Sequence, residues 1–244
     1  MNDSNLIPPP LLPLAPSREP APLGQTPDEL APIPGPVSAF EAMLRQPRRV
    51  MCQLRQERPG RLIATLLLIA TLCGALYGLV VGAFSGGTQL WAAPVKIVAG
   101  LWLSALICLP SLYIFSCLSG AQARLADVLG LLGGTLCLLS VLLIGFAPVA
   151  WVFSQSTESA VAMGVLHLLF GAIAVGFGLR FLDAGFAQLL AKSRAGLTVW
   201  IIIFVLVLLQ MTTALRPIVG RADTVLPTEK KFFLQHWGDS LSGR

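Results

Sequence analysis

The chain has 244 residues, of which 55% are hydrophobic and 12% are charged, and its formal net charge is +5. Soluble domains carry about 25% charged residues, so this composition argues against a soluble enzyme, and the mean hydropathy of +0.76 agrees. A small positive charge on so apolar a chain gives no support to nucleic-acid binding. We predict an all-α, polytopic transmembrane helix bundle.

Residues 1–36 contain 11 of the 18 prolines. Proline fixes φ and donates no backbone hydrogen bond, so we predict a disordered tail with polyproline II character. The simplest role for such a tail is a tether. The alternative is a ligand for a proline-binding domain.

A basic juxtamembrane segment follows over residues 37–61. Ser38 and Glu41 fit a capping box that starts a short helix, and Pro47 interrupts it. We predict a broken amphipathic element lying on an anionic leaflet, where each arginine adds roughly 1 kcal/mol of attraction. It would set the topology; the alternative is a docking surface for a cytoplasmic partner. Its arginines are Arg45, Arg48, Arg49, Arg55, Arg58 and Arg61.

Five apolar runs follow, and together they predict a membrane domain over residues 62–218. Each run is close to the roughly 20 residues that a helix needs to cross the hydrocarbon, where backbone groups must bond internally. The predicted spans are 62–84, 97–118, 128–153, 160–182 and 197–215, and residues 219–244 form a C-terminal tail.

Loop charge predicts the orientation. If the N-terminal side is cytoplasmic, the inner segments, with Arg180 included, carry 11 Lys and Arg, whereas the two outer loops carry one. The N-terminus is therefore expected in the cytoplasm. Five spans send the C-terminal tail outside, although five Lys and Arg follow residue 215. Trp91, Trp151, Trp200 and Trp237 are expected near the interfaces, and Lys96 is expected to reach the headgroups.

Two predicted spans carry strips of glycine. The first has Gly74, Gly78 and Gly82, a repeated GxxxG pattern, and the fourth has Gly164, Gly171 and Gly178 at seven-residue spacing. Such strips let helices approach closely. We predict that they pack against each other or against another subunit.

Polar and kink-forming residues inside the spans are few. His167 and Gln210 are expected at similar depth on the antiparallel fourth and fifth spans, so we predict a hydrogen bond between them, with proton handling by His167 as the sharper alternative. Pro110 lies in the middle of the second span and predicts a kink, which would be structural or would serve as a hinge.

The sequence contains no pattern for catalysis. No span has Asp or Glu in its middle, the two histidines lie far apart, and no nucleotide, metalloprotease or hydrolase motif occurs. We therefore expect no catalytic residues, no metal, no cofactor and no disulfide among the five cysteines.

Two stretches carry a resemblance. Ala93-Pro-Val-Lys96 leads into Leu109-Pro-Ser-Leu-Tyr113, and Ala214-Leu-Arg-Pro-Ile-Val-Gly220 follows the last span. Together they resemble a family of uncharacterised bacterial multi-pass membrane proteins, from which Ile218 departs because an aromatic residue is usual there. The resemblance implies the bacterial inner membrane and no established activity. The span arrangement also looks like the Yip1 fold, by analogy only.

The functional prediction is a non-enzymatic accessory or assembly subunit of a membrane complex. Its expected partners are the lipid bilayer and either another membrane protein or further copies of itself, and not nucleic acid. The alternative is a permease or channel subunit for a small solute, with a polar path near His167 and Gln210 and a hinge at Pro110. An intramembrane enzyme is the least favoured interpretation.

Overall fold

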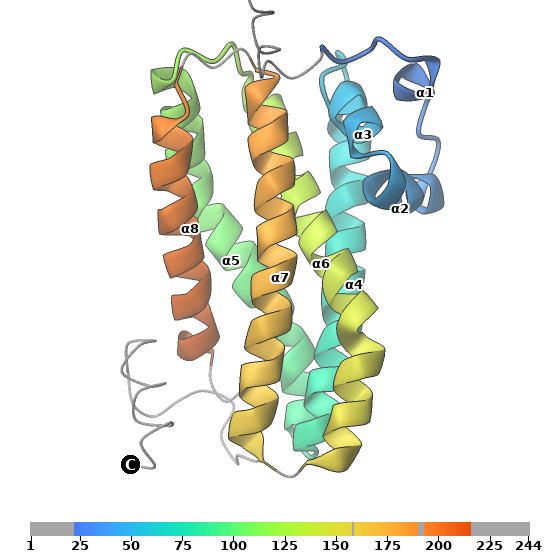
Figure 1. Cartoon of the computed structure of the whole chain (residues 1–244), viewed down its shortest axis with the longest axis vertical. Coiled ribbons are helices and arrows are strands. Elements are labelled where there is room, and N and C mark those ends of the chain that lie inside the picture. Colours follow the sequence, from blue (N-terminus) through green and yellow to red (C-terminus); the bar gives the residue numbers. More distant parts are fainter. Residues whose placement is uncertain (1–21, 158, 190–192, 216–244) are drawn as a thin grey trace, which may run out of the picture.

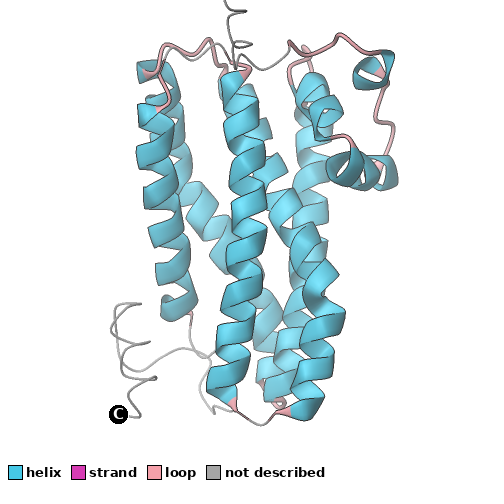
Figure 2. Cartoon of the chain, in the orientation of Figure 1, coloured by secondary structure: helices cyan, strands magenta, loops and turns pink. Residues whose placement is uncertain are grey.

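The computed structural model describes residues 22–157, 159–189 and 193–215, and all of their regular structure is helical (Figure 2). Five of these helices are long and apolar enough to cross a membrane. The predicted fold class, an all-helical bundle with five spans, is confirmed. The predicted C-terminal tail lies outside the described residues.

The five long helices begin or end a few residues beyond the predicted limits. They are α4 (Gly60–Ser85), α5 (Gln89–Leu118), α6 (Leu125–Ser156), α7 (Ala160–Ala187) and α8 (Ala195–Ala214). The largest difference is at α5, because the predicted outer loop of 85–96 is only a tight turn. Gly86 and Gly87 make that turn with positive φ of 68° and 55°, a conformation that glycine adopts without strain.

Successive helices run in opposite directions (Figure 1). α4 packs against α5 and α6, α6 packs against α7, and α5 packs against α8. α5 runs obliquely behind the front helices, from the side of α4 to the side of α8 (Figure 1). α7 and α8 are consecutive in the chain, yet they share no more than marginal contact.

Three short helices lie at the end of the bundle where α4 begins: α1 (Pro27–Leu30), α2 (Pro36–Arg45) and α3 (Pro47–Leu54) (Figure 1). We call residues 22–58, which contain them, the cap. The prediction of a disordered tail is therefore wrong for residues 22–36, whereas residues 1–21 lie outside the described part. Each of the three helices has a proline at its first position, where the missing N–H would have no helical partner anyway.

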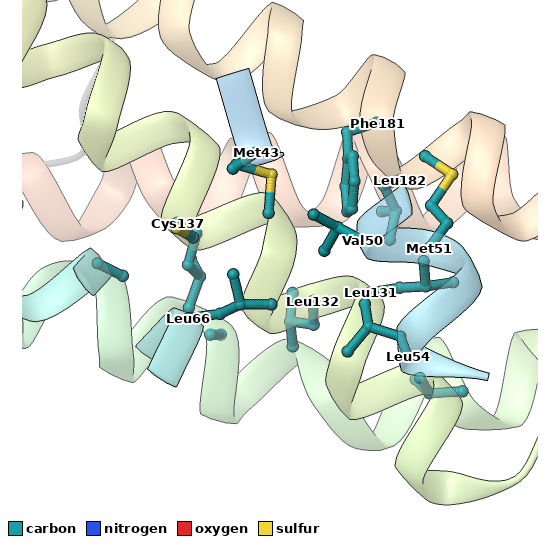
Figure 3. Close-up of a cluster of buried hydrophobic side chains, with 14 of the residues drawn as sticks. Met43, Val50, Met51, Leu54, Leu66, Leu131, Leu132, Cys137, Phe181 and Leu182 are labelled. Atoms are coloured by element: carbon teal, nitrogen blue, oxygen red, sulfur yellow. The ribbon is translucent and has the colours of Figure 1, made fainter. Parts of the chain in front are cut away.

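The cap is anchored by apolar side chains. Met43, Val50, Met51 and Leu54 are at most 5% exposed and belong to the same buried cluster as Leu66, Leu131, Leu132, Cys137, Phe181 and Leu182 (Figure 3). Glycines of α6 make room for them: a Cβ on Gly130 would lie 2.9 Å from Leu54 Cδ2. The apolar face that we predicted to rest on lipid instead faces the bundle core.

Candidate functional site

The cap is held together by a buried carboxylate. Arg48 Nε donates to Glu29 Oε1 at 2.6 Å, and the Gly24 N–H donates to Glu29 Oε2 at 2.6 Å. Arg48 also donates to the Pro22 carbonyl at 3.0 Å. Glu29 is 8% exposed. These hydrogen bonds, that from Arg48 first, hold the pKa of Glu29 below its ordinary value.

Other arginines of the cap bind backbone carbonyls. Arg49 donates to the carbonyls of Ala31 at 3.0 Å and Pro32 at 2.8 Å, which fastens α3 to the segment before α2. Arg55 donates to the carbonyl of Gln188 at 2.8 Å, which ties α3 to the end of α7. All three are charge-assisted hydrogen bonds within the chain.

A second ion pair, at the start of α6, contacts the cap. Arg124 Nη2 lies 3.0 Å from Asp127 Oδ1, and it also donates to the carbonyls of Arg55 and Gln56 at 3.2 Å each. The bond to Asp127 raises the pKa of Arg124 above its ordinary value. On the outside of α2, Arg45 lies 3.4 Å from Glu41 in an exposed i,i+4 pair, a geometry that contributes little to stability.

The six arginines predicted to face the membrane surface are thus divided by the structure. Arg48, Arg49 and Arg55 build the cap, and Arg45 pairs with Glu41. Arg58 and Arg61 are exposed, and their guanidinium groups make no hydrogen bond or ion pair within the described residues. Both line one cleft, with a volume of about 220 Å³, between the cap and the first turn of α4. We predicted an element lying flat on the leaflet, but this segment is a folded cap. Only Arg58 and Arg61 of its six arginines keep guanidinium groups without a partner among the described residues.

A polar pair joins α4 to α7 inside the bundle. Tyr77 Oη and His167 Nδ1 lie 2.7 Å apart, and the two rings meet edge to face with centroids 5.6 Å apart. Tyr77 is 3% exposed. His167 Nε2 is buried and has no hydrogen-bond partner among the described residues. Since a neutral imidazole offers one donor and one acceptor, the ring keeps one unmet hydrogen bond in either tautomer.

The predicted hydrogen bond between His167 and Gln210 is wrong. Gln210 lies on α8, which packs against α5, whereas His167 lies on α7, which packs against α6. The sequence did hold a signal for the true partner. Tyr77 lies eight residues before the end of α4, and His167 lies seven residues after the start of α7 at the same end of the bundle.

Other buried polar groups near the centre of the bundle carry no evident chemistry. The hydroxyl oxygens of Ser104 and Ser140 are buried without a partner among the described residues. A Cβ on Gly74 would lie 3.8 Å from Ser140 Oγ, so this serine faces α4. Within the described residues, no three His, Cys, Asp or Glu side chains come together in a way that could hold a metal ion.

The proline of α5 lies at a helix–helix junction. α5 continues as one helix through Pro110, and Trp200 Nε1 of α8 donates to the carbonyl of Cys108 at 2.8 Å. Trp200 is fully buried and stacks on Phe204 at 4.9 Å between centroids, so its indole N–H is satisfied within the chain, and its place near a membrane interface stays a prediction. α8 therefore binds α5 two residues before Pro110. Lys96 is also buried, and its Nζ donates to Gln89 Oε1 at 3.3 Å.

The glycines of α4 lie against α5. A Cβ on Gly78 would fall onto Cα of Pro94, and one on Gly82 would lie 2.7 Å from the Gln89 carbonyl oxygen. On Gly74 it would meet Val98 of α5 at 3.6 Å. This strip is thus used within the chain, and its neighbour is α5 rather than α7.

The glycines of α7 are used unequally. A Cβ on Gly178 would meet Thr135 of α6 at 3.2 Å, whereas one on Gly171 would meet nothing within 4 Å. Gly164 is half-buried. Gly176, five residues further along α7, is also open. One end of α7 therefore packs closely on α6, and its middle presents glycines that no described residue covers.

Comparison with known proteins adds no family. No protein-family model matches the chain, and neither a characterised protein nor a solved structure shows significant similarity to it. The resemblance to a bacterial membrane family therefore stays a prediction.

Proposed function

We propose that this protein is a non-enzymatic subunit of a membrane complex and that it binds its partner through the outward face of α7. The observation that carries the proposal is the divergence of α7 from α8. Consecutive membrane helices usually pack against each other, but here α7 lies on α6 and α8 lies on α5. A helix from another chain can occupy the side of α7 that α8 leaves open.

The exposed side of α7 has the composition of a helix–helix contact. Ala172 and Gly176 are exposed and four residues apart, and Gly171 beside them would also accept a Cβ without a clash. Small residues at this spacing let a second helix approach closely in lipid. Large apolar side chains that are 38–54% exposed flank them, namely Val165, Leu169, Ile173 and Phe177.

The test is affinity purification from native membranes in mild detergent, with the tag on the proline-rich N-terminus. We expect a stoichiometric membrane partner, either another protein or further copies of this chain, to accompany the wild type. Gly176→Leu should abolish that association, because leucine fits the isolated chain but fills the contact. Gly145→Leu on α6 is the matched control, since its Cβ also meets nothing within 4 Å.

Two outcomes would refute the proposal. The first is a wild type that purifies as a lone monomer. The second is a partner that Gly176→Leu retains as well as Gly145→Leu does. If both variants lose the partner, the contact is not specific to α7, and that result also counts against the proposal.

We further propose that the protein resides in a bacterial inner membrane with its cap in the cytoplasm. The excess of Lys and Arg at the cap end supports this orientation. A protease added to inverted inner-membrane vesicles should then remove the N-terminal tag, and the same protease added to intact spheroplasts should leave it. The reverse pattern would overturn the orientation.

A permease or channel subunit is the second candidate, and the unpartnered His167 Nε2 favours it. A buried nitrogen of this kind can bind one polar group of a solute. His167→Ala should then reduce solute flux in reconstituted vesicles, whereas it should leave partner binding through α7 unchanged. A complex that forms normally around His167→Ala, with no flux in either form, would favour the accessory subunit.

A further inference from the structure

The cleft between the cap and α4 is lined by two arginines whose guanidinium groups have no partner within the described residues. Arg58 and Arg61 line it together with Gln56, and none of its lining residues is acidic. Gln56 reaches it from the chain that follows α3. The first turn of α4 also lines it, so backbone N–H groups that lack helical acceptors lie at the same place as the two guanidinium groups. All of these groups favour an anion.

The position of the cleft distinguishes between kinds of anion. It lies where α4 enters its apolar run, and Leu62 and Ile33 belong to its lining. Arg61, Thr65, Leu68, Leu72 and Leu76 follow one another at spacings of three or four residues, so they share one face of α4. The three leucines are 52–55% exposed. A cationic cleft thus sits directly above an open apolar track.

We infer that this cleft binds the phosphate headgroup of an anionic phospholipid, with an acyl chain lying along Leu68, Leu72 and Leu76. A phospholipid joins the two chemistries that this face presents: a phosphate for Arg58 and Arg61, and a hydrocarbon chain for the leucine track. Free phosphate would use only the first. Guanidinium groups suit this role because they bind phosphate oxygens in a bidentate manner.

The experiment is native mass spectrometry of the full-length protein, delipidated in a neutral detergent and titrated with phosphatidylglycerol or with phosphatidylcholine. We expect the wild type to bind the first phosphatidylglycerol more tightly than the first phosphatidylcholine. Arg58→Gln/Arg61→Gln should weaken that first binding about thirtyfold, as expected for two arginines at a lipid surface. Arg45→Gln/Arg180→Gln is the control, because it removes two exposed charges outside the cleft.

Further measurements keep the inference falsifiable. Arg58→Lys/Arg61→Lys keeps both charges and should retain most of the preference, and elution as a monodisperse peak shows that each variant is folded. The inference is overturned if both double glutamine variants lose phosphatidylglycerol equally, because the attraction is then a general one. It is also overturned if no variant changes lipid binding, or if millimolar inorganic phosphate displaces the lipid, since the cleft would then be a site for free phosphate.

Discussion

The contact between α4 and α5 offers a sharp test of the packing, because it is made by backbone. A Cβ added to Gly78 would fall onto Cα of Pro94 and lie 2.9 Å from the Pro94 nitrogen. Neither atom belongs to a side chain that can rotate away. In Gly78→Ala the two helices must therefore separate, and every contact along their shared face must loosen with them.

The size of the effect follows from two opposing terms. Overpacking a well-packed interior costs about 1–3 kcal/mol, and a backbone obstacle places Gly78→Ala near the upper end of that range. Replacing glycine by alanine in a helix gains up to about 1 kcal/mol in helix propensity. The net loss at Gly78 should be about 1–2 kcal/mol. Gly145→Ala keeps only the favourable term, because its Cβ meets nothing within 4 Å.

The free energy of unfolding can be measured by titrating the detergent-solubilised protein with sodium dodecyl sulfate and following its helicity. Gly78→Ala should unfold at lower dodecyl sulfate than the wild type, and Gly145→Ala at equal or higher dodecyl sulfate. If the two alanine variants are equally stable, α4 and α5 do not approach each other as closely as the structure has them, and the assignment of this glycine strip to α5 is wrong.

Three further predictions concern the cap and the two interhelical hydrogen bonds. Glu29→Gln should loosen the cap at pH 7, and Cys52 should then react faster with a membrane-impermeant maleimide. Because the pKa of Glu29 is lower in the folded protein than in the unfolded chain, its contribution is complete at neutral pH and is lost as the pH falls below about 4.5, so an acid-active protease should cleave the cap there. Trp200→Phe removes the donor to the α5 carbonyl and should cost about 0.6–1.7 kcal/mol in the dodecyl sulfate titration. A double-mutant cycle of Tyr77→Phe and His167→Phe should give a coupling energy in the same range, and no coupling would contradict the pair.

The membrane spans were predictable because the hydrocarbon of a bilayer restricts the backbone to few conformations. A run of about twenty apolar residues that must satisfy its backbone internally has to be a helix. The ends were harder to predict, since a helix continues through polar residues wherever the bundle covers them. Lys96 illustrates this: its charge suggested a loop, yet it is 4% exposed inside α5 because the turn at Gly86 and Gly87 is so short.

The cap was missed because proline was counted without regard to its position. A proline-rich composition predicts disorder, but Pro27, Pro36 and Pro47 each occupy the first position of a helix. Ser38, predicted as the N-cap of α2, lies at its third position, and its hydroxyl donates to the carbonyl of the actual N-cap, Gly35, at 2.9 Å. Burial of Glu29 depends on a partner 19 residues away, a pairing that no local pattern reports.

The partner of His167 was missed for a different reason. Depth along the membrane can be read from a sequence, and by depth both Tyr77 and Gln210 were candidates. Which helices are neighbours cannot be read in that way, and the assumption that consecutive spans pack together selected Gln210. The structure breaks that assumption at α7 and α8. The proposed interface on α7 starts from this same divergence of α7 and α8.

The arginines of the cap show how one charge pattern serves several purposes. Topology depends on where positive charge lies and not on which atoms it touches, so Arg48, Arg49 and Arg55 still mark this end of the chain while they bind Glu29 and backbone carbonyls. Counting charge therefore predicts the orientation but gives no information on which arginines remain available to a ligand. That follows only from assigning every hydrogen bond, and the assignment leaves Arg58 and Arg61 in one cleft. If the cap served only as a topology signal, any two arginines would be equivalent in lipid binding, and the comparison of Arg58→Gln/Arg61→Gln with Arg45→Gln/Arg180→Gln would show no difference.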